Sequence, residues 1–222
     1  MERNNITSFE SREDLINEVI TKHNITKELG KGTEGTCYLG TDNFVYKIMH
    51  PNYERETGII YNINKIITTK DIELEYFSLP EQLYTINRRL IGCKTKYIAP
   101  DLFNYKKSHP IHQIEFYKLL KAYYLMQREI EKISQDNILI YDLPSNLIFT
   151  GEKLVAIDTL GYKRIEKKPL TENKKSLDVA ILFALNLMIE RQKLMTEDQL
   201  TELNNEPNIE EYIKKLSKRI NK

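Results

Sequence analysis

The sequence feature that most constrains the fold is a glycine-rich stretch followed by a lysine in a β-prone segment. The glycines are Gly30, Gly32 and Gly35, and Lys47 follows twelve residues after the last of them, in the run 44–48. Glycine lets backbone N–H groups approach a ligand without a Cβ clash, so such a loop is typical of a phosphate cradle. Three nearby glycines are also common in ordinary turns. The predicted secondary structure on either side of the glycines therefore distinguishes a phosphate-binding loop from an ordinary turn.

These neighbours are predicted to be strands, at 25–29, 35–40 and 44–49, with a Thr-Asp-Asn turn at 41–43. In the dinucleotide-binding fingerprint of Rossmann folds, the third glycine opens a helix. Here Gly35 opens a short β-prone segment instead. The pattern therefore favours a β-hairpin around the glycines and disfavours a Rossmann fold.

Further along the chain, strands and helices alternate and then give way to helices. The segment 54–67 carries four isoleucines at helical spacing and is predicted to be a helix with Glu56 on its inward side. A capping serine opens a helix at 11–20, and Thr196 opens a capping pattern before another helix. The remaining predicted strands are 82–87, 89–98, 138–141, 147–149 and 154–157, and the remaining helices are 114–133, 177–191 and 209–220.

Bulk composition excludes several classes of protein. The 222 residues carry a formal net charge of +1, which favours neither nucleic acid nor an anionic membrane as a partner. Two cysteines without a C-x-x-C pair disfavour a zinc site and exclude a disulfide framework. The N-terminus lacks the apolar core of a signal peptide, and no run approaches transmembrane length. We expect a cytoplasmic protein, with signal-less secretion as an effector left open.

Four polar residues complete a possible phosphate-handling set. Asp142 and Asn146 lie in the run Ile-Tyr-Asp-Leu-Pro-Ser-Asn, Asp158 follows a buried-type strand, and Asp178 lies in the run Ser-Leu-Asp-Val-Ala. Taken alone, Asp142 and Asn146 are ordinary turn residues, and Asp178 is an ordinary helix charge. In this order and on these elements, residues 25–191 resemble the protein-kinase-like superfamily, whose motifs are G-x-G-x-x-G-x-V, V-A-I-K, H-R-D-L-x-x-x-N and D-F-G.

The resemblance implies an α+β, bilobal protein-kinase-like fold. Residues 1–98 would form an N-lobe, with an antiparallel β-sheet, an N-terminal helix and the glutamate helix. Residues 99–222 would form a reduced, mainly helical C-lobe that holds the catalytic loop. The run around Asp178 resembles the start of the family's helix whose aspartate braces that loop.

The resemblance also implies a binding site for ATP. Gly30, Gly32 and Gly35 would cradle the phosphates. Lys47 would contact the α and β phosphates, held by an ion pair to Glu56, with Glu54 as the alternative partner. The adenine would lie between Cys37, Val45 and Ile148, and backbone groups near Lys96 to Ile98 would bind its edge.

The catalytic residues follow from the same resemblance. Asp142 would orient or deprotonate the accepting hydroxyl, and Asn146 and Asp158 would offer Mg²⁺ the hard oxygen ligands it prefers. The chain departs from the family in its loop, which is one residue shorter between Asp142 and Asn146 and lacks the preceding His-Arg pair. No A-P-E segment follows Asp158. These departures resemble compact bacterial or effector-type kinases and small-molecule phosphotransferases.

We therefore expect an ATP- and Mg-dependent phosphotransferase, a compact protein Ser/Thr kinase without a regulated activation segment. Its partner would be a protein substrate or a regulated protein. One alternative is a pseudokinase that binds nucleotide or a partner without turnover, which the shortened loop favours. Another is a small-molecule kinase of the aminoglycoside-phosphotransferase type, although the acidic substrate insert of that class is missing.

Overall fold

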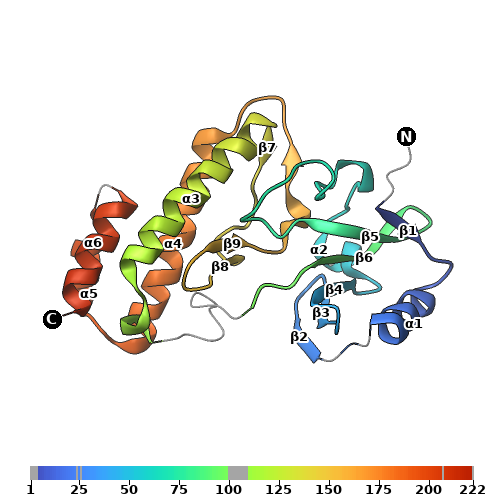
Figure 1. Ribbon diagram of the computed structural model, residues 1–222, viewed down its shortest axis with the longest axis horizontal. Coiled ribbons are helices and arrows are strands. Elements are labelled where there is room, and N and C mark those ends of the chain that lie inside the picture. The colour runs from blue at the N-terminus through green and yellow to red at the C-terminus, as the bar shows by residue number, and fades with distance from the viewer. Residues whose placement is uncertain (1–4, 24, 26, 100–109, 207, 222) are drawn as a thin grey trace. The chain divides into compact units, whose positions relative to one another are not determined.

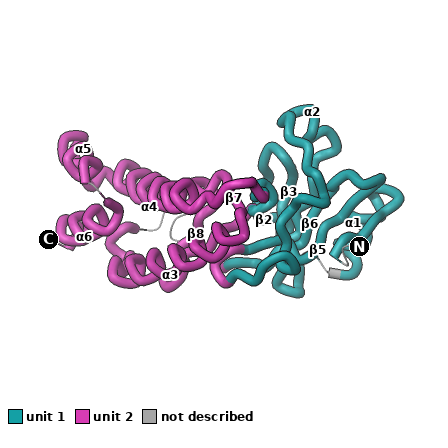
Figure 2. The backbone as a smooth tube through the Cα atoms, turned by 90° about the horizontal axis from the view of Figure 1, so that it is seen from above, with its two compact units in different colours: residues 1–74, 78–98, 159–163 teal, residues 75–77, 99–158, 164–222 magenta. Residues whose placement is uncertain are grey.

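The computed structural model describes residues 5–23, 25, 27–99, 110–206 and 208–221 and is of the α+β class. The chain divides into two units (Figure 1, Figure 2). The first contains residues 1–74, 78–98 and 159–163, and the second contains 75–77, 99–158 and 164–222. This division differs from the predicted 1–98 and 99–222 in two short segments that the units exchange.

A mixed six-stranded sheet forms the first unit, in the order β1-β5-β6-β4-β3-β2. Its strands are β1 (Ile6–Ser8), β2 (Lys27–Lys31), β3 (Gly35–Leu39), β4 (Phe44–Met49), β5 (Pro80–Ile86) and β6 (Arg89–Lys96). The prediction of a wholly antiparallel sheet is wrong at one edge, because β1 pairs parallel with β5. A strand of three residues is too short to show the period-two pattern from which strands are predicted.

Helix α1 (Arg12–His23) covers one face of this sheet. Its Leu15 and Val19 pack with Tyr46, Tyr84 and Ile91 of the strands. Side chains alternate between the faces of a strand, so the neighbour of Tyr46 in β4, the lysine at position 47, lies on the opposite face. The core of that opposite face includes Ile63, Ile66, Leu83, Leu90, Cys93 and Leu160.

The predicted helix at 54–67 is wrong for most of its length. Only α2 (Tyr53–Thr57) and the 3₁₀ turn η1 (Ile63–Lys65) are helical within it. Gly58 ends α2 in the left-handed conformation, with φ of 71°, and its N–H donates to the carbonyl of Glu54. The isoleucines beyond this cap do not share one buried helical side, since Ile60 is 78% exposed whereas Ile67 is buried. The glycine cap therefore overrides the helical spacing.

Helices dominate the second unit. They are α3 (Phe116–Gln135), α4 (Leu170–Gln192), α5 (Glu197–Asn204) and α6 (Ile209–Ile220), together with the 3₁₀ turn η2 (Ile111–Gln113). Its short strands are β7 (Ile138–Leu139), β8 (Leu147–Phe149) and β9 (Leu154–Ala156). The 3₁₀ turn η3 (Thr159–Gly161) belongs to the first unit, and β10 (Lys163–Arg164) lies where the chain returns to the second. Strands β8 and β9 form an antiparallel hairpin. The inward side of α3 includes Leu119, Met126 and Ile130.

Capping explains where two of these helices begin. Thr196 and Gln199 form the predicted reciprocal capping box at α5, and the Asn208 side chain caps α6, whose bounds match the prediction. In contrast, α4 begins at Leu170, directly after Pro169, and not at residue 177. Asp178 therefore lies inside a helix and not at its start. Over the residues described, none of the helices has the length and apolarity needed to cross a membrane.

Candidate functional site

The predicted glycine hairpin is formed by β2 and β3, which pair antiparallel on either side of a tight turn. The Gly32 N–H donates to the Gly35 carbonyl at 2.9 Å and closes this turn. A Cβ at Gly35 would lie 2.4 Å from the carbonyl oxygen of Ile48, so the fold itself requires glycine there. A Cβ at Gly30 would meet nothing within 4 Å, and one at Gly32 would meet only a backbone oxygen at 3.9 Å. The turn is therefore open to a ligand at two of its three glycines.

Lys47 lies in the middle of β4, between β3 and β6. It is opposite Cys37 on one side and Cys93 on the other. Val45, two residues earlier, shares its face of the sheet. Lys47 is only 8% exposed. The structure thus places Cys37, Val45 and Lys47 on one face of the glycine hairpin's sheet.

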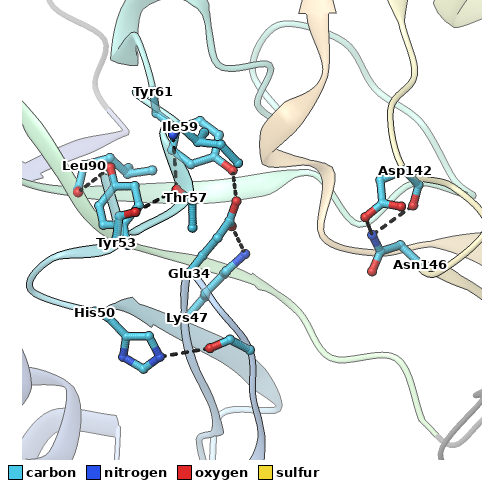
Figure 3. A network of polar contacts seen from close by, with 11 residues as sticks. Glu34, Lys47, His50, Tyr53, Thr57, Ile59, Tyr61, Leu90, Asp142 and Asn146 are labelled. Atoms are coloured by element: carbon cyan, nitrogen blue, oxygen red, sulfur yellow. Dashed lines mark hydrogen bonds and ion pairs between the residues drawn. The ribbon is translucent and has the colours of Figure 1, made fainter. Parts of the chain in front are cut away.

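The carboxylate that pairs with Lys47 is Glu34, within the glycine turn (Figure 3). The Lys47 Nζ lies 2.7 Å from Glu34 Oε2, and the Tyr61 hydroxyl donates to Glu34 Oε1 at 2.8 Å. The prediction that Lys47 pairs with Glu56 is wrong, because Glu56 is exposed at the end of α2. The alternative, Glu54, instead accepts a hydrogen bond from the Tyr53 hydroxyl at 3.3 Å. The shortness of α2 explains why neither helical glutamate reaches the lysine.

The turn is also fixed from its far side by His50. The His50 N–H donates to the Glu34 carbonyl at 2.7 Å, and the His50 ring is 3.0 Å from the Gly32 carbonyl (Figure 3). The Arg12 guanidinium donates in turn to the carbonyls of Met49 and His50. Burial lowers the pKa of Arg12. No motif in the sequence pointed to Glu34, Tyr61 or His50.

The backbone expected to bind the adenine edge is partly engaged within the protein. The Ser78 hydroxyl donates to the Lys96 carbonyl at 2.9 Å, and the Tyr97 N–H donates to the Asn43 carbonyl at 3.3 Å. Lys96 itself is exposed, and Ile98 is half-buried. A carbonyl oxygen has two lone pairs, so the Lys96 carbonyl can accept a second hydrogen bond.

In the second unit, Asp142 and Asn146 form a single hydrogen-bonded loop. The Asn146 side-chain amide donates to the Asp142 carbonyl at 3.0 Å and to the Asp142 carboxylate at 3.3 Å (Figure 3). The Asn146 N–H donates to the Leu143 carbonyl at 3.0 Å. Asp142 is exposed and has a left-handed φ of 49°, a conformation that aspartate tolerates better than most residues. These contacts hold the short loop in one shape.

Asp158 and Asn146 lie at the same end of the β8–β9 hairpin. Leu147 pairs with Ala156, and the Ile157 N–H donates to the Asn146 carbonyl at 2.8 Å. Asp158 follows directly, is exposed, and has φ of 51°. The hairpin thus brings the two predicted metal ligands to one end, and both offer the oxygen donors that suit Mg²⁺. Ile148, predicted to contact the adenine, is buried in β8.

The residue that supports this loop is Asn173 and not Asp178. Asn173 is completely buried in α4. Its side chain accepts from the Ile140 N–H and donates to the Ile138 carbonyl and the Ser134 hydroxyl, each at 2.9 Å. Because Asn173 bonds the backbone immediately before Asp142, it fixes where the loop begins.

Asp178 has a different position from the one the resemblance implied. It accepts a hydrogen bond at 2.8 Å from the hydroxyl of Tyr123 in α3, and Gln127 donates to the same hydroxyl at 2.6 Å. Burial raises the pKa of Asp178, and the Tyr123 hydrogen bond and Lys174 partly offset this. Asp178 therefore joins α3 to α4. The prediction that it braces the catalytic loop, which carries Asp142, is wrong.

Comparison with protein-family models and with curated proteins finds no match to this chain. The functional argument accordingly rests on the residues described above.

Proposed function

We propose that the chain is an ATP- and Mg²⁺-dependent phosphotransferase, a compact protein Ser/Thr kinase. The observation that carries the proposal is the buried Lys47, held at a fixed point beside a glycine turn that is open at Gly30 and Gly32. A buried cation beside a turn where no Cβ blocks a close approach suits a phosphate chain. The first unit would bind ATP through this arrangement, with Cys37 and Val45 against the adenine.

In this proposal the second unit would supply the groups that phosphoryl transfer needs besides nucleotide binding. Asn146 and Asp158 would hold Mg²⁺, which neutralises phosphate charge when it is bound. Asp142 would orient the accepting hydroxyl and receive its proton. The left-handed backbone at both aspartates supports these roles, because such conformations concentrate at functional sites. We propose that the phosphoryl group is transferred to a hydroxyl of a protein substrate and that the reaction takes place in the cytoplasm.

The second candidate is a pseudokinase that binds nucleotide without turnover. It is favoured by the hydrogen bond of the Asn146 amide to the Asp142 carboxylate, which engages both residues with each other. The two candidates share the ATP site and differ only in transfer.

Thermal unfolding with increasing ATP, with and without Mg²⁺, tests the shared part. A ligand that binds only the folded state raises its stability by mass action. We expect a rise for the wild type that Mg²⁺ enlarges, and none for Lys47→Ala relative to its own nucleotide-free baseline. A wild type that does not respond to millimolar ATP contradicts both candidates.

Transfer of labelled phosphate from ATP to the chain itself or to a generic protein then separates them. For a kinase, Asp142→Asn and Asp158→Ala each abolish transfer. For a pseudokinase, ATP binds without turnover and Asp142→Asn leaves binding unchanged. Consumption of ATP only with a small hydroxylated metabolite would instead identify a small-molecule kinase.

A further inference from the structure

Glu34 is the one carboxylate that projects from the glycine turn to the buried lysine. An ammonium group in a buried position loses hydration, and this loss is large unless an opposite charge and hydrogen bonds replace the water. The Lys47 and Glu34 side chains are only 10% and 17% exposed, and their charged atoms are 2.7 Å apart. This contact is therefore shielded from solvent, unlike the ion pairs on the surface of the chain.

Three contacts fix Glu34 itself. One carboxylate oxygen accepts from Lys47, the other accepts from the Tyr61 hydroxyl, and the backbone carbonyl accepts from the His50 N–H. Both side-chain oxygens and the main chain are thus held by elements outside the turn. A side chain fixed at each end in this way holds its partner at a defined point.

We propose that Glu34 is the residue that positions Lys47 toward the phosphates of the bound nucleotide, so that the glycine turn and the lysine act as one rigid unit. This inference rests on the proposed ATP-binding function and adds to it a positioning residue that lies in the turn instead of a helix. Tyr61 supports Glu34 from the other side. The glutamates of α2 have no part in it, because Glu56 is exposed and Glu54 is bonded by Tyr53.

The first experiment needs no nucleotide, so it tests the ion pair separately from ATP binding. Lysines are labelled with a limiting amount of an amine-acylating reagent, and the extent at Lys47 is read by peptide mass spectrometry. We expect Glu34→Gln to increase labelling of Lys47 severalfold and Tyr61→Phe to increase it less. Glu28→Gln, an exposed glutamate on β2 of the same hairpin, is the matched control and leaves it unchanged. An increase with Glu56→Gln and none with Glu34→Gln would overturn the assignment.

The second experiment measures ATP affinity of the same variants by titration calorimetry. Glu34→Gln should weaken ATP binding about tenfold, as expected when one charge-assisted hydrogen bond that fixes a ligating group is lost. Tyr61→Phe should weaken it less, and Glu28→Gln should not change it. Tyr61→Phe keeps the Glu34 carboxylate and removes only the hydrogen bond that supports it. This variant therefore still tests the positioning role if Glu34→Gln folds poorly.

Two outcomes of the titration contradict the proposal. Tighter ATP binding by Glu34→Gln would mean that this carboxylate competes with the phosphates for Lys47. Equal binding by the wild type and Glu34→Gln, with labelling changed, would mean that the ion pair serves stability alone. If the wild type itself binds no ATP, the proposed function fails and the inference fails with it, whatever the labelling shows.

Discussion

The lysine of the first unit and the acidic loop of the second are held in place in different ways. Lys47 is buried, and side chains fix it, through Glu34 and then Tyr61. Asp142 is exposed, and the amide side chains of Asn146 and Asn173 fix the backbone of its loop and of the strand before it. A buried charge depends on the opposite charge beside it, whereas an exposed carboxylate depends on the shape of the chain that carries it. The two regions should therefore respond to different substitutions.

Asn173→Leu is the largest perturbation that this comparison predicts. It keeps the branched shape of the side chain and leaves the Ile140 N–H, the Ile138 carbonyl and the Ser134 hydroxyl without the bonds that Asn173 gives them. Loss of several buried hydrogen bonds should lower the free energy of unfolding by about 3–5 kcal/mol, measured by urea denaturation. Asn17→Leu, at an exposed position of α1, is the control and should change it by less than about 0.5 kcal/mol. A loss as small as that of the control would show that Asn173 does not fix the loop.

Substitution of the glycines separates close packing from ligand access within the turn. Gly35→Ala should lower stability by about 2–3 kcal/mol, because its methyl group would overlap the Ile48 carbonyl. Gly30→Ala has open space and should change stability by less than about 0.5 kcal/mol, while it weakens ATP binding. Thermal unfolding with and without ATP measures both quantities. If Gly30→Ala binds ATP as the wild type does, the open side of the turn is not where the phosphates lie.

A double-mutant cycle tests how strongly the buried ion pair couples. Lys47→Met and Glu34→Gln, alone and together, should give a coupling free energy of about 1–2 kcal/mol in urea denaturation, because the pair is largely shielded from water. The exposed pair Lys22 and Glu18 in α1 is the comparison and should give less than about 0.5 kcal/mol. Equal couplings would contradict the idea that burial distinguishes the lysine.

The smallest effect is expected at Asp178, a half-buried carboxyl group in the second unit. Its pKa in the folded state is raised by burial above the usual 3.8, so the folded state binds the proton more tightly than the unfolded state does. This contribution to stability is complete below the usual pKa and is lost as the pH rises through the raised value. Asp178→Asn should lack this decline, in urea denaturation from pH 3.8 to neutrality. An identical pH dependence of the two proteins would contradict the role of burial.

Local signals in the sequence were sufficient for much of the fold. Strand β4 and helix α6 have the predicted bounds, because a turn and a capping residue mark them. The predicted 54–67 helix was wrong because its spacing was weighed without Gly58, whose left-handed cap ends α2. Strand β1 was not predicted, because its pairing depends on β5, far along the chain, and not on its own three residues.

Part of the candidate site was likewise predictable from local sequence signals, and part was not. The sequence predicted the glycine hairpin, which the structure confirms, and a lysine in the neighbouring strand. It did not predict Glu34 or Asn173, because each acts on residues that only the folded chain brings near. Glu34 reaches Lys47 across the β3–β4 pairing, and Asn173 reaches Ile138 and Ile140 from α4. The roles of Asp142, Asn146 and Asp158 in transfer stay predictions.

The parallel pairing of β1 with β5 has a consequence for the order of folding. The Ser8 and Thr85 hydroxyls that meet across it at 3.0 Å are 77 positions apart in the sequence. Contacts between distant residues form slowly, since a long loop must close first, whereas β2, β3 and β4 pair through short turns. During synthesis, β1 has no partner until β5 has left the ribosome. We therefore expect the glycine hairpin to assemble early and the β1 edge of the sheet to close last.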